Sequence, residues 1–387
     1  MGGGSQVVRR VLIITGEASG DLHGAHLAAA LKAQAPGVTI LGVGGPRMRA
    51  AGVELVQDIG HVDVIGLVGL SAARTLVRRI LTLRRLLRHE PLDLVVLIDN
   101  PGLNFHFARL AKHAGLRVVY YIAPQLWAWR PRRMRWMQRR VDHVMVILPF
   151  EEELYRRAGV PCTFVGHPLL DDVAPAYDRD RLRAAFGLPR DACVIGLLPG
   201  SRTGEVKSLL PVFLEAARLL QRDRAVRLIL AVAETVEQET IKRMCDEAGL
   251  DVRLVPQDPN GVMAASDMLF IASGTATLQA AIIGTPMVIA YKLPWFTYLL
   301  ARLLVRVGSI GLANIVAGKP FIPELIQHRA TPQNLAGEAR RILDDAAYRD
   351  GMRAEMGRVR ALLGEPGASA RAAAVVLDQL RAEGAAR

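Results

Sequence analysis

Two short loops in the second half of the chain have the composition and position of phosphate-binding turns. The first runs from Gly200 to Gly204 after the apolar residues 194–198, and it contains Ser201 and Arg202. The second consists of Ser273, Gly274 and Thr275, and it also follows an apolar run and begins a helical segment. Such turns point backbone N–H groups and the positive end of a helix at an anion, and an arginine adds a fork of donors. Ordinary β–α turns share the pattern, but two such loops in one half-chain favour a nucleotide site with two walls.

Candidate acid–base residues follow two apolar runs in the first half. Asp99 ends the run 93–98 and precedes Asn-Pro-Gly. It is either a carboxylate at the C-terminal edge of a parallel sheet, where open α/β sheets place their chemistry, or a turn residue. Glu17 and Ser19 lie in the turn after the run 8–15. That turn is not GxGxxG, so no dinucleotide is expected, and a helix cap by Ser19 or Asp21 is the alternative reading.

Two basic segments could contact a membrane or a nucleic acid. Residues 64–88 place leucines at helical spacing among many arginines, which include Arg78, Arg79, Arg84 and Arg85. This pattern fits either a core helix with a solvated arginine face or an amphipathic element on anionic lipid. Residues 123–140 interleave aromatic and basic side chains, among them Trp127, Trp129 and Arg130. Such interleaving can stack bases or seat tryptophan at a lipid interface.

Composition limits the class of protein. The 387 residues carry a net charge of +12, which favours phosphorylated substrates, anionic lipid or polyanions as partners. The three cysteines are widely spaced, so we expect reduced thiols in a cytoplasmic protein and no metal site. No apolar run approaches the length of a membrane span, so any membrane contact is expected at the surface of the protein.

Apolar runs alternate with helical patterns along the whole chain, which is typical of α/β domains with parallel sheets. The polar, proline-bearing segment 171–190 separates two halves with the same plan. We therefore predict two doubly wound, Rossmann-like domains that face each other across a cleft. The predicted strands are 8–15, 39–43, 92–99, 117–122, 143–148 and 161–166 in the first half, and lie near 193–198, 226–232, 252–255, 268–271 and 286–290 in the second.

Eleven short stretches, in the same order along nearly the whole chain, resemble the lipid-A-disaccharide synthases, which are inverting glycosyltransferases of the GT-B type. Together they are far more specific than any one of them. They are 16–21, 44–48, 98–104, 124–130, 148–151, 165–168, 198–206, 273–276, 286–288, 314–318 and 323–327.

The resemblance implies a reaction and a separate role for each half of the chain. UDP-2,3-diacylglucosamine would transfer its sugar to 2,3-diacylglucosamine 1-phosphate, giving a β-1,6-linked disaccharide 1-phosphate and UDP, with no metal or other cofactor. Residues 1–171 would hold the acceptor, with the helices of 346–387 packing back on them, and residues 172–345 would hold UDP. The enzyme would be cytoplasmic and peripheral on the anionic inner-membrane surface, and homodimers occur in the family.

Carried onto this sequence, the resemblance implies the following site. The general base is Asp99, with Glu17 as the second candidate. The acceptor and membrane residues are Ser19, Trp127, Trp129, Arg130, Arg78, Arg79, Arg84 and Arg85. The donor residues are Gly200, Ser201, Arg202, Ser273, Gly274, Thr275, Gln279, Asn314, Glu324 and Gln327.

Departures from the family pattern leave room for other functions. Gln279 stands where members commonly have glutamate, and Gly69 stands where many have an acid. A UDP-GlcNAc 2-epimerase or a divergent membrane glycosyltransferase would share the fold and the loops, although an epimerase needs no Trp/Arg interface. A basic nucleic-acid-binding protein is the more remote alternative, since no known nucleic-acid module is present.

Overall fold

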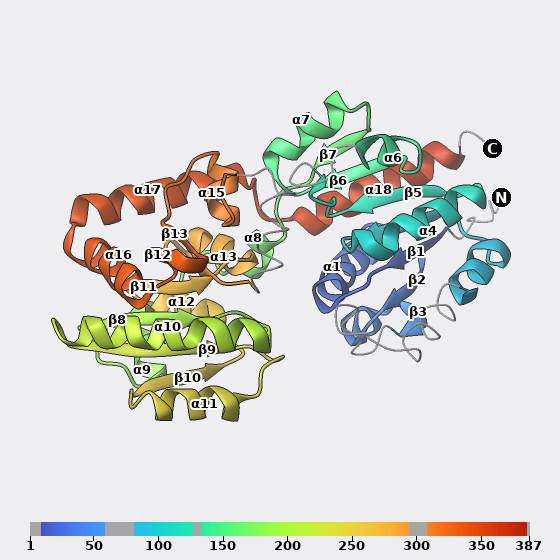
Figure 1. Cartoon of the computed structure of the whole chain (residues 1–387). Helices are drawn as coiled ribbons and strands as arrows, with labels where there is room; N and C mark the ends of the chain where they lie inside the picture. Colours follow the sequence, from blue (N-terminus) through green and yellow to red (C-terminus); the bar gives the residue numbers. More distant parts are fainter. Residues whose placement is uncertain (1–8, 59–80, 127–132, 294–307, 385–387) are drawn as a thin grey trace. The chain divides into compact units, whose positions relative to one another are not determined.

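The computed structural model describes residues 9–58, 81–126, 133–293 and 308–384, and the chain divides into two compact units (Figure 1). The first unit comprises Met1–Asp171 together with Gly364–Arg387, and the second comprises Asp172–Leu363. The division at 171/172 falls at the boundary expected from the polar segment that follows.

The first unit contains a parallel sheet of seven strands in the order β3-β2-β1-β4-β5-β6-β7. Its central strand β4 reads Leu-Val-Val-Leu-Ile and is buried along its whole length, as expected for an inner strand of a parallel sheet covered on both faces. The strands are β1 (Arg10–Ile14), β2 (Thr39–Gly44), β3 (Glu54–Asp58), β4 (Leu94–Ile98), β5 (Arg117–Tyr121), β6 (His143–Val146) and β7 (Cys162–Phe164).

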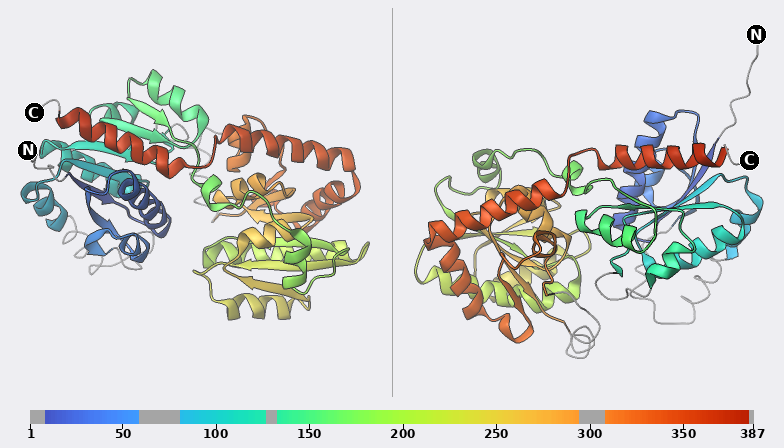
Figure 2. Two further views of the ribbon diagram at one scale, coloured as in Figure 1. Left: turned by 180° about the vertical axis from the view of Figure 1, so that it is seen from behind. Right: turned by 90° about the horizontal axis from the view of Figure 1, so that it is seen from above.

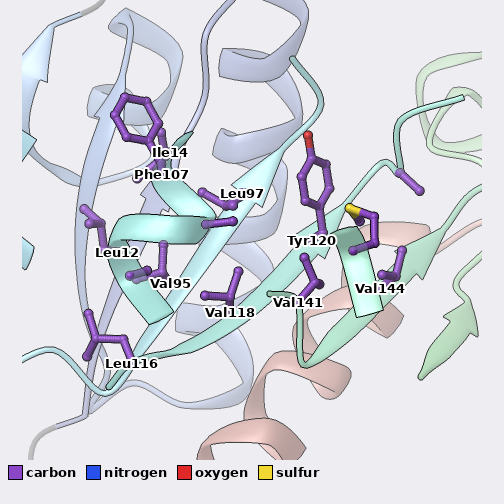
Figure 3. Packing of buried hydrophobic residues seen from close by; sticks show 14 of the residues in the cluster. Leu12, Ile14, Val95, Leu97, Phe107, Leu116, Val118, Tyr120, Val141 and Val144 are labelled. Atoms are coloured by element: carbon purple, nitrogen blue, oxygen red, sulfur yellow. The ribbon is translucent and has the colours of Figure 1, made fainter. Parts of the chain in front are cut away.

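Helices cover both faces of this sheet. One face packs against helical residues 81–89, α4, α6 and α7, and its core includes Leu87. Val95, Phe107 and Tyr120 belong to the same core (Figure 3). The other face packs against α1, α2 and α18, which lies along the sheet in red in Figure 2. The helices are α1 (Ala18–Gln34), α2 (Pro46–Ala50), α4 (Pro101–His113), α6 (Met134–Gln138), α7 (Pro149–Arg157), α8 (Leu169–Asp172) and α18 (Ala368–Gly384).

The second unit repeats the plan with six parallel strands in the order β10-β9-β8-β11-β12-β13. The strands are β8 (Cys193–Leu198), β9 (Val226–Val232), β10 (Val252–Pro256), β11 (Met268–Ala272), β12 (Met287–Tyr291) and β13 (Glu324–Ile326). The helices are α9 (Arg179–Ala185), α10 (Thr203–Gln221), α11 (Gln238–Glu247), α12 (Pro259–Ala265), α13 (Thr275–Ile283), α15 (Leu312–Ala317), the 3₁₀ turn η2 (Gln327–Arg329), α16 (Pro332–Asp344) and α17 (Ala346–Leu362).

The structure corrects the expected path of the last helices. Only α18 returns to the first unit, where it packs against α1 and β5. Helix α17 was also expected there, but it packs against α13, α15 and α16 and belongs to the second unit. Its buried side chains Met352, Met356 and Val359 form an apolar stripe, and this stripe is covered by those neighbours.

Two strands were not expected from the sequence. Strand β3 lies at the edge of its sheet and has no fully buried residue, so it lacks a continuous apolar run. Strand β13 has three residues and is also an edge strand. Both are recognised only through their pairing with a neighbour.

Candidate active site

The first candidate site lies where the strand order of the first sheet reverses. From β1 the chain proceeds to β2 on one side, and from β4 it proceeds to β5 on the other, so the loops after these adjacent strands diverge. Open α/β sheets bind their ligands at such a point. The loops carry Gly16, Glu17, Asp99 and Asn100, and we refer to these four residues as the first switch point.

The two loops are in close contact. A Cβ atom placed on Gly16 would lie 2.3 Å from Nδ2 of Asn100, so only glycine fits there without a rearrangement. The same Nδ2 donates a hydrogen bond to Oε1 of Glu17 at 3.5 Å. The fold therefore brings together the two carboxylates that the sequence offered as separate candidates.

The backbone at Asp99 and Asn100 adopts an unusual conformation. Their φ values are +48° and +38°, and consecutive non-glycine residues in the left-handed region are costly in free energy. The carbonyl oxygen of Asp99 is held by the Tyr120 hydroxyl at 2.5 Å and by Nδ2 of Asn104 at 2.7 Å. Asn104 is buried, and its Nδ2 also donates to the carbonyl of Ile98 at 2.9 Å.

This network holds the backbone of Asp99 in place directly after β4. The hydroxyl of Tyr120 points away from the surrounding apolar side chains in Figure 3, and it is this group that reaches Asp99. Strained backbone that is held by buried partners is typical of functional sites. The sequence offered no signal for Tyr120, because it lies inside the apolar strand β5.

The environment of Asp99 alters its acidity. Burial raises the pKa of the Asp99 carboxyl, the nearby charge of Glu17 raises it further, and the backbone N–H of Asn100 partly opposes the rise. Glu17 itself is exposed. A half-buried carboxylate with a raised pKa beside a second carboxylate has the properties of a general base.

The motif of residues 16–21 serves two purposes. Glu17 is the N-cap residue of α1 without a side-chain cap bond, and Ser19 is exposed in the first turn. Asp21 caps a different helix from the one considered in the sequence: its buried carboxylate accepts from the backbone N–H groups of Gly45, Arg47 and Met48, at 2.7, 3.0 and 3.1 Å. Asp21 is therefore committed to starting α2.

Two histidines of the first unit, the half-buried His23 and the buried His167, have lowered pKa values. Burial lowers the pKa of His23 to about 4, with a contribution from His26, and lowers that of His167 to about 3, with a contribution from His23. Both imidazoles are therefore neutral at pH 7. Within the described part of the chain, Nδ1 of His23 is buried without a hydrogen-bond partner.

The second candidate site lies at the corresponding reversal in the other sheet. Strands β8 and β11 are neighbours, and the chain leaves them toward β9 and β12 on opposite sides. The loops after them are the two phosphate-type loops of the sequence, and they lead directly into α10 and α13. We refer to Gly200, Ser201, Arg202, Ser273, Gly274 and Thr275 as the second switch point.

Both helices begin there without a side-chain cap bond. Their positive N-terminal ends therefore remain suited to an anion. Ser201, Arg202, Gly274 and Thr275 are exposed. Ser273 is half-buried, and its hydroxyl donates to the carbonyl of Ile310 at 2.9 Å, so it supports the loop.

A charged cluster surrounds the first of these loops. Nη1 of Arg202 lies 3.0 Å from Oε1 of Glu205, and the Arg202 side chain is 66% exposed. Gly200 has φ +116°, and a Cβ there would meet Oε2 of Glu205 at 2.4 Å. Burial raises the pKa of Tyr291, Glu205 raises it further and Arg202 opposes the rise, so this tyrosine at the end of β12 lies within reach of both charges. The sequence offered no signal for Tyr291.

Three of the expected donor residues make hydrogen bonds within the fold. Asn314 is buried. Its Nδ2 donates to the carbonyl of Ile322 and to Oε1 of Glu324, and its Oδ1 accepts from the backbone N–H groups of Phe321 and Ile322. Glu324 accepts from the backbone N–H groups of Ile310 and Gly311 at the start of α15. Gln327 exchanges two hydrogen bonds with the backbone of Leu293, at 2.6 and 3.0 Å. The polar atoms of these side chains form hydrogen bonds within the fold, and a sequence motif does not show this.

Gln279 has a looser role. It is half-buried in the second turn of α13, and its Nε2 lies 3.5 Å from Oδ1 of Asn260, at the limit of a hydrogen bond. Its amide remains free to exchange that partner for another.

Several expected residues lie outside the described part of the chain: Gly69, Arg78, Arg79, Trp127, Trp129 and Arg130. Arg84 and Arg85 are described, and both are exposed on the helix of residues 81–89. Among the described residues no group of three His, Cys, Asp or Glu side chains could hold a metal ion. No helix within the described ranges is long and apolar enough to cross a membrane.

The chain matches a known family over nearly its whole length. Residues 11–375 match the model of the lipid-A-disaccharide synthetase family. The lipid-A-disaccharide synthase of Geobacter metallireducens is 45% identical over 375 residues, covering 96% of this chain and 97% of the relative. That of Trichlorobacter lovleyi is 44% identical over 374 residues, covering 96% and 98%.

Solved structures of similar fold are more distant in sequence. The UDP-GlcNAc 2-epimerase of Neisseria meningitidis bound to UDP-GlcNAc superposes with a TM-score of 0.66 at 13% identity, covering 95% of this chain and all of that one. Acinetobacter baumannii MurG superposes with a TM-score of 0.58 at 13% identity, covering 96% and 99%. At these identities the likeness supports the GT-B fold of two parallel-sheet α/β domains and nothing finer.

Proposed function

Because the chain belongs to the lipid-A-disaccharide synthase family, we propose that it is an inverting glycosyltransferase that joins two acylated glucosamines. The donor is UDP-2,3-diacylglucosamine and the acceptor is 2,3-diacylglucosamine 1-phosphate. The products are the β-1,6-linked disaccharide 1-phosphate and UDP. The match over residues 11–375 carries this conclusion.

The first switch point is the proposed acceptor site. The acceptor 6-hydroxyl oxygen attacks C1 of the donor sugar, the bond from C1 to the UDP oxygen breaks, and Asp99 takes the hydroxyl proton. The rigid backbone at Asp99, held through Tyr120 and Asn104, keeps its carboxylate in place for this transfer. Glu17 acts on the base through its charge, because it raises the pKa of Asp99 and so strengthens it as a proton acceptor. Ser19 in the first turn of α1 is a proposed acceptor contact.

The second switch point is the proposed UDP site. As the sugar leaves, negative charge grows on the diphosphate, and the N-terminal N–H groups of α10 and α13 are positioned to stabilise it. Arg202 is exposed, and among the described residues its ion pair is with Glu205 at its own helix terminus, so it can turn to the diphosphate at small cost. Gln279 is a proposed contact to the ribose. Asn314, Glu324 and Gln327 support this site from behind.

We also propose that the enzyme works from the cytoplasmic surface of the inner membrane. Both substrates carry acyl chains, and Arg84 and Arg85 expose two cations on one helix. Arg78, Arg79, Trp127, Trp129 and Arg130 extend the same expectation. A homodimer is implied by the family.

The decisive experiment is mass spectrometry of the product that purified protein makes from the two acylated sugars. We expect a tetra-acylated disaccharide monophosphate and one UDP released per disaccharide. A matched reaction with UDP-GlcNAc alone should leave that sugar unchanged. Release of its C2 epimer, with no disaccharide from the acylated substrates, would replace the proposal with a UDP-GlcNAc 2-epimerase.

A further inference from the structure

A groove in the first unit, formed by two helix faces, concentrates positive charge. It has a volume of about 390 Å³ and lies between helical residues 81–89 and α4. Arg84 and Arg88 line it from the first helix, and Arg109 lines it from α4. The residues from each helix are spaced by three or four positions, so each set projects from one helix face. We call this feature the arginine groove.

The floor of the arginine groove is apolar. Leu87 is buried and Leu110 is half-buried, and both line the groove. His106 and His113 complete its walls, and Nδ1 of His113 is held by the carbonyl of Arg109 at 2.7 Å. A ligand in this groove would contact arginine guanidinium groups with its polar part and leucine side chains with its apolar part.

Within the described part of the chain, no carboxylate neutralises the charge of the groove. Between residues 81 and 114 the carboxylates are Glu90, Asp93 and Asp99. Glu90 pairs with Arg10 at 2.9 Å, Asp93 pairs with Arg9 at 3.2 Å, and Asp99 lies at the first switch point. In the described ranges, no carboxylate forms an ion pair with Arg84, Arg88 or Arg109. Arginines grouped in this way repel one another unless an anion binds between them.

The groove is separate from the first switch point. Helix α4 starts beside Asp99 and runs away from it, and Arg109 lies eight residues beyond Pro101. At 1.5 Å per residue, Arg109 is about 12 Å farther along the helix axis. An acceptor hydroxyl beside Asp99 therefore leaves the arginine groove open.

We propose that the arginine groove is a binding site for a phosphate group carried next to an apolar group, and that it is distinct from the transfer site. Arginine forks match phosphate oxygens in geometry and charge. The headgroup of an anionic phospholipid and a free phosphate ester share this chemistry. The site does not depend on the proposed transfer reaction.

The test is titration calorimetry of the full chain with two soluble probes: short-chain phosphatidylglycerol below its micelle concentration, and inorganic phosphate. The variants are Arg88→Gln and Arg109→Gln in the groove, with Arg381→Gln as the matched control. Arg381 is exposed on α18 in the same unit and does not line the groove. All three variants lower the net charge equally.

We expect each groove variant to weaken binding by about tenfold or more, since each removes a charge-assisted contact. Arg381→Gln should stay within about twofold of the wild type, because only diffuse attraction changes. Binding of the lipid probe alone identifies a phospholipid headgroup as the ligand, and binding of both probes shows that the phosphate group suffices. Either result supports the site.

Three results would overturn the proposal: absence of binding by both probes, equal losses in Arg381→Gln and Arg88→Gln, or a parallel loss of transfer and phosphate binding. Transfer measured with detergent-dispersed substrates should be unchanged in Arg88→Gln. A parallel loss of transfer and phosphate binding would show that the groove is part of the transfer site. If the wild type made no disaccharide at all, the proposed function would fail, while the binding result would stand independently.

Discussion

Replacing Asp99 by asparagine should reduce activity and raise stability at the same time. The amide keeps the size of the carboxyl and one acceptor oxygen, but it cannot take the proton of the acceptor hydroxyl. General-base contributions are typically about 10²–10⁴-fold, so turnover should fall by that factor, which corresponds to about 2.7–5.5 kcal/mol in the transition-state free energy. Binding of UDP should not change, since the second unit contributes the proposed UDP site.

The gain in stability follows from the raised pKa of Asp99. Burial and the charge of Glu17 raise this pKa above the ordinary value of 3.8, so the native state favours the protonated carboxyl. The stability that this preference contributes is fully present at pH values below the pKa of the carboxyl in the unfolded state. It is lost as the pH rises through the pKa of the carboxyl in the folded state. At pH 7 the ionised Asp99 therefore destabilises the native state, and Asp99→Asn removes this cost. The stability difference between variant and wild type should shrink as the pH falls toward 4.

The same substitution at the other end of the strand supplies a matched control. Asp93 immediately precedes β4, and its carboxylate accepts from Nη1 of Arg9 at 3.2 Å and from the backbone N–H of Arg10 at 2.8 Å. Asp93→Asn weakens these charge-assisted bonds and should lower the free energy of unfolding by about 1.5–3 kcal/mol, with turnover retained. For a unit of this size that is a fall in Tm of about 3–12 °C.

The assay combines turnover, from UDP release, with thermal unfolding followed across pH. Full turnover in Asp99→Asn would remove this residue as the base and transfer the role to Glu17. A lower stability in Asp99→Asn at pH 7, together with the lost activity, would mean that Asp99 serves as a turn residue. Either outcome would refute the reasoning from burial and charge.

Four further changes test the rest of the site. Glu17→Gln should move the acidic limb of the kcat profile to lower pH, because a charge that raises the pKa of Asp99 is gone; an unmoved limb would remove Glu17 from this role. Arg202→Ala should lower transfer tenfold or more, from a lost contact of about 1.5–3 kcal/mol, while Lys207→Ala on the same helix should not. Asn314→Ala should destabilise the second unit by about 2–4 kcal/mol in chemical unfolding, because four hydrogen bonds are lost; a stable variant that binds UDP weakly would restore Asn314 as a donor contact. Replacing four arginines by glutamine should shift the protein from the membrane to the soluble fraction, because each contributes about 1 kcal/mol to membrane binding. A loss of stability alone would indicate a core helix. The four are Arg78, Arg79, Arg84 and Arg85.

The sequence alone was sufficient to predict the fold class and the strands that carry the site. Central strands such as β4 and β8 are continuous apolar runs, because a parallel sheet covered on both faces buries nearly all of their residues. The residues after them lie at one edge of the sheet wherever the strands are parallel. The sequence could therefore place Asp99, Arg202 and the loop at Ser273 at the ends of strands without knowledge of the strand order.

Edge elements and helix docking required the tertiary structure. Strands β3 and β13 carry no continuous buried run, and they form because a neighbouring strand offers free hydrogen-bonding groups. The apolar stripe of α17 predicts that this helix packs against something, but not whether the partner is α13 or the first unit.

The assignment of polar side chains was decided by the tertiary structure alone. Asn314, Glu324 and Gln327 match family motifs as well as Arg202 does, yet their polar atoms are satisfied by backbone groups nearby in space. Tyr120 lies in an apolar strand and gave no signal, although it holds the carbonyl of Asp99. The physical reason is that a sequence records which hydrogen-bonding groups exist. Which of them are paired within the fold, and which are left for a ligand, depends on distances that only the folded chain sets.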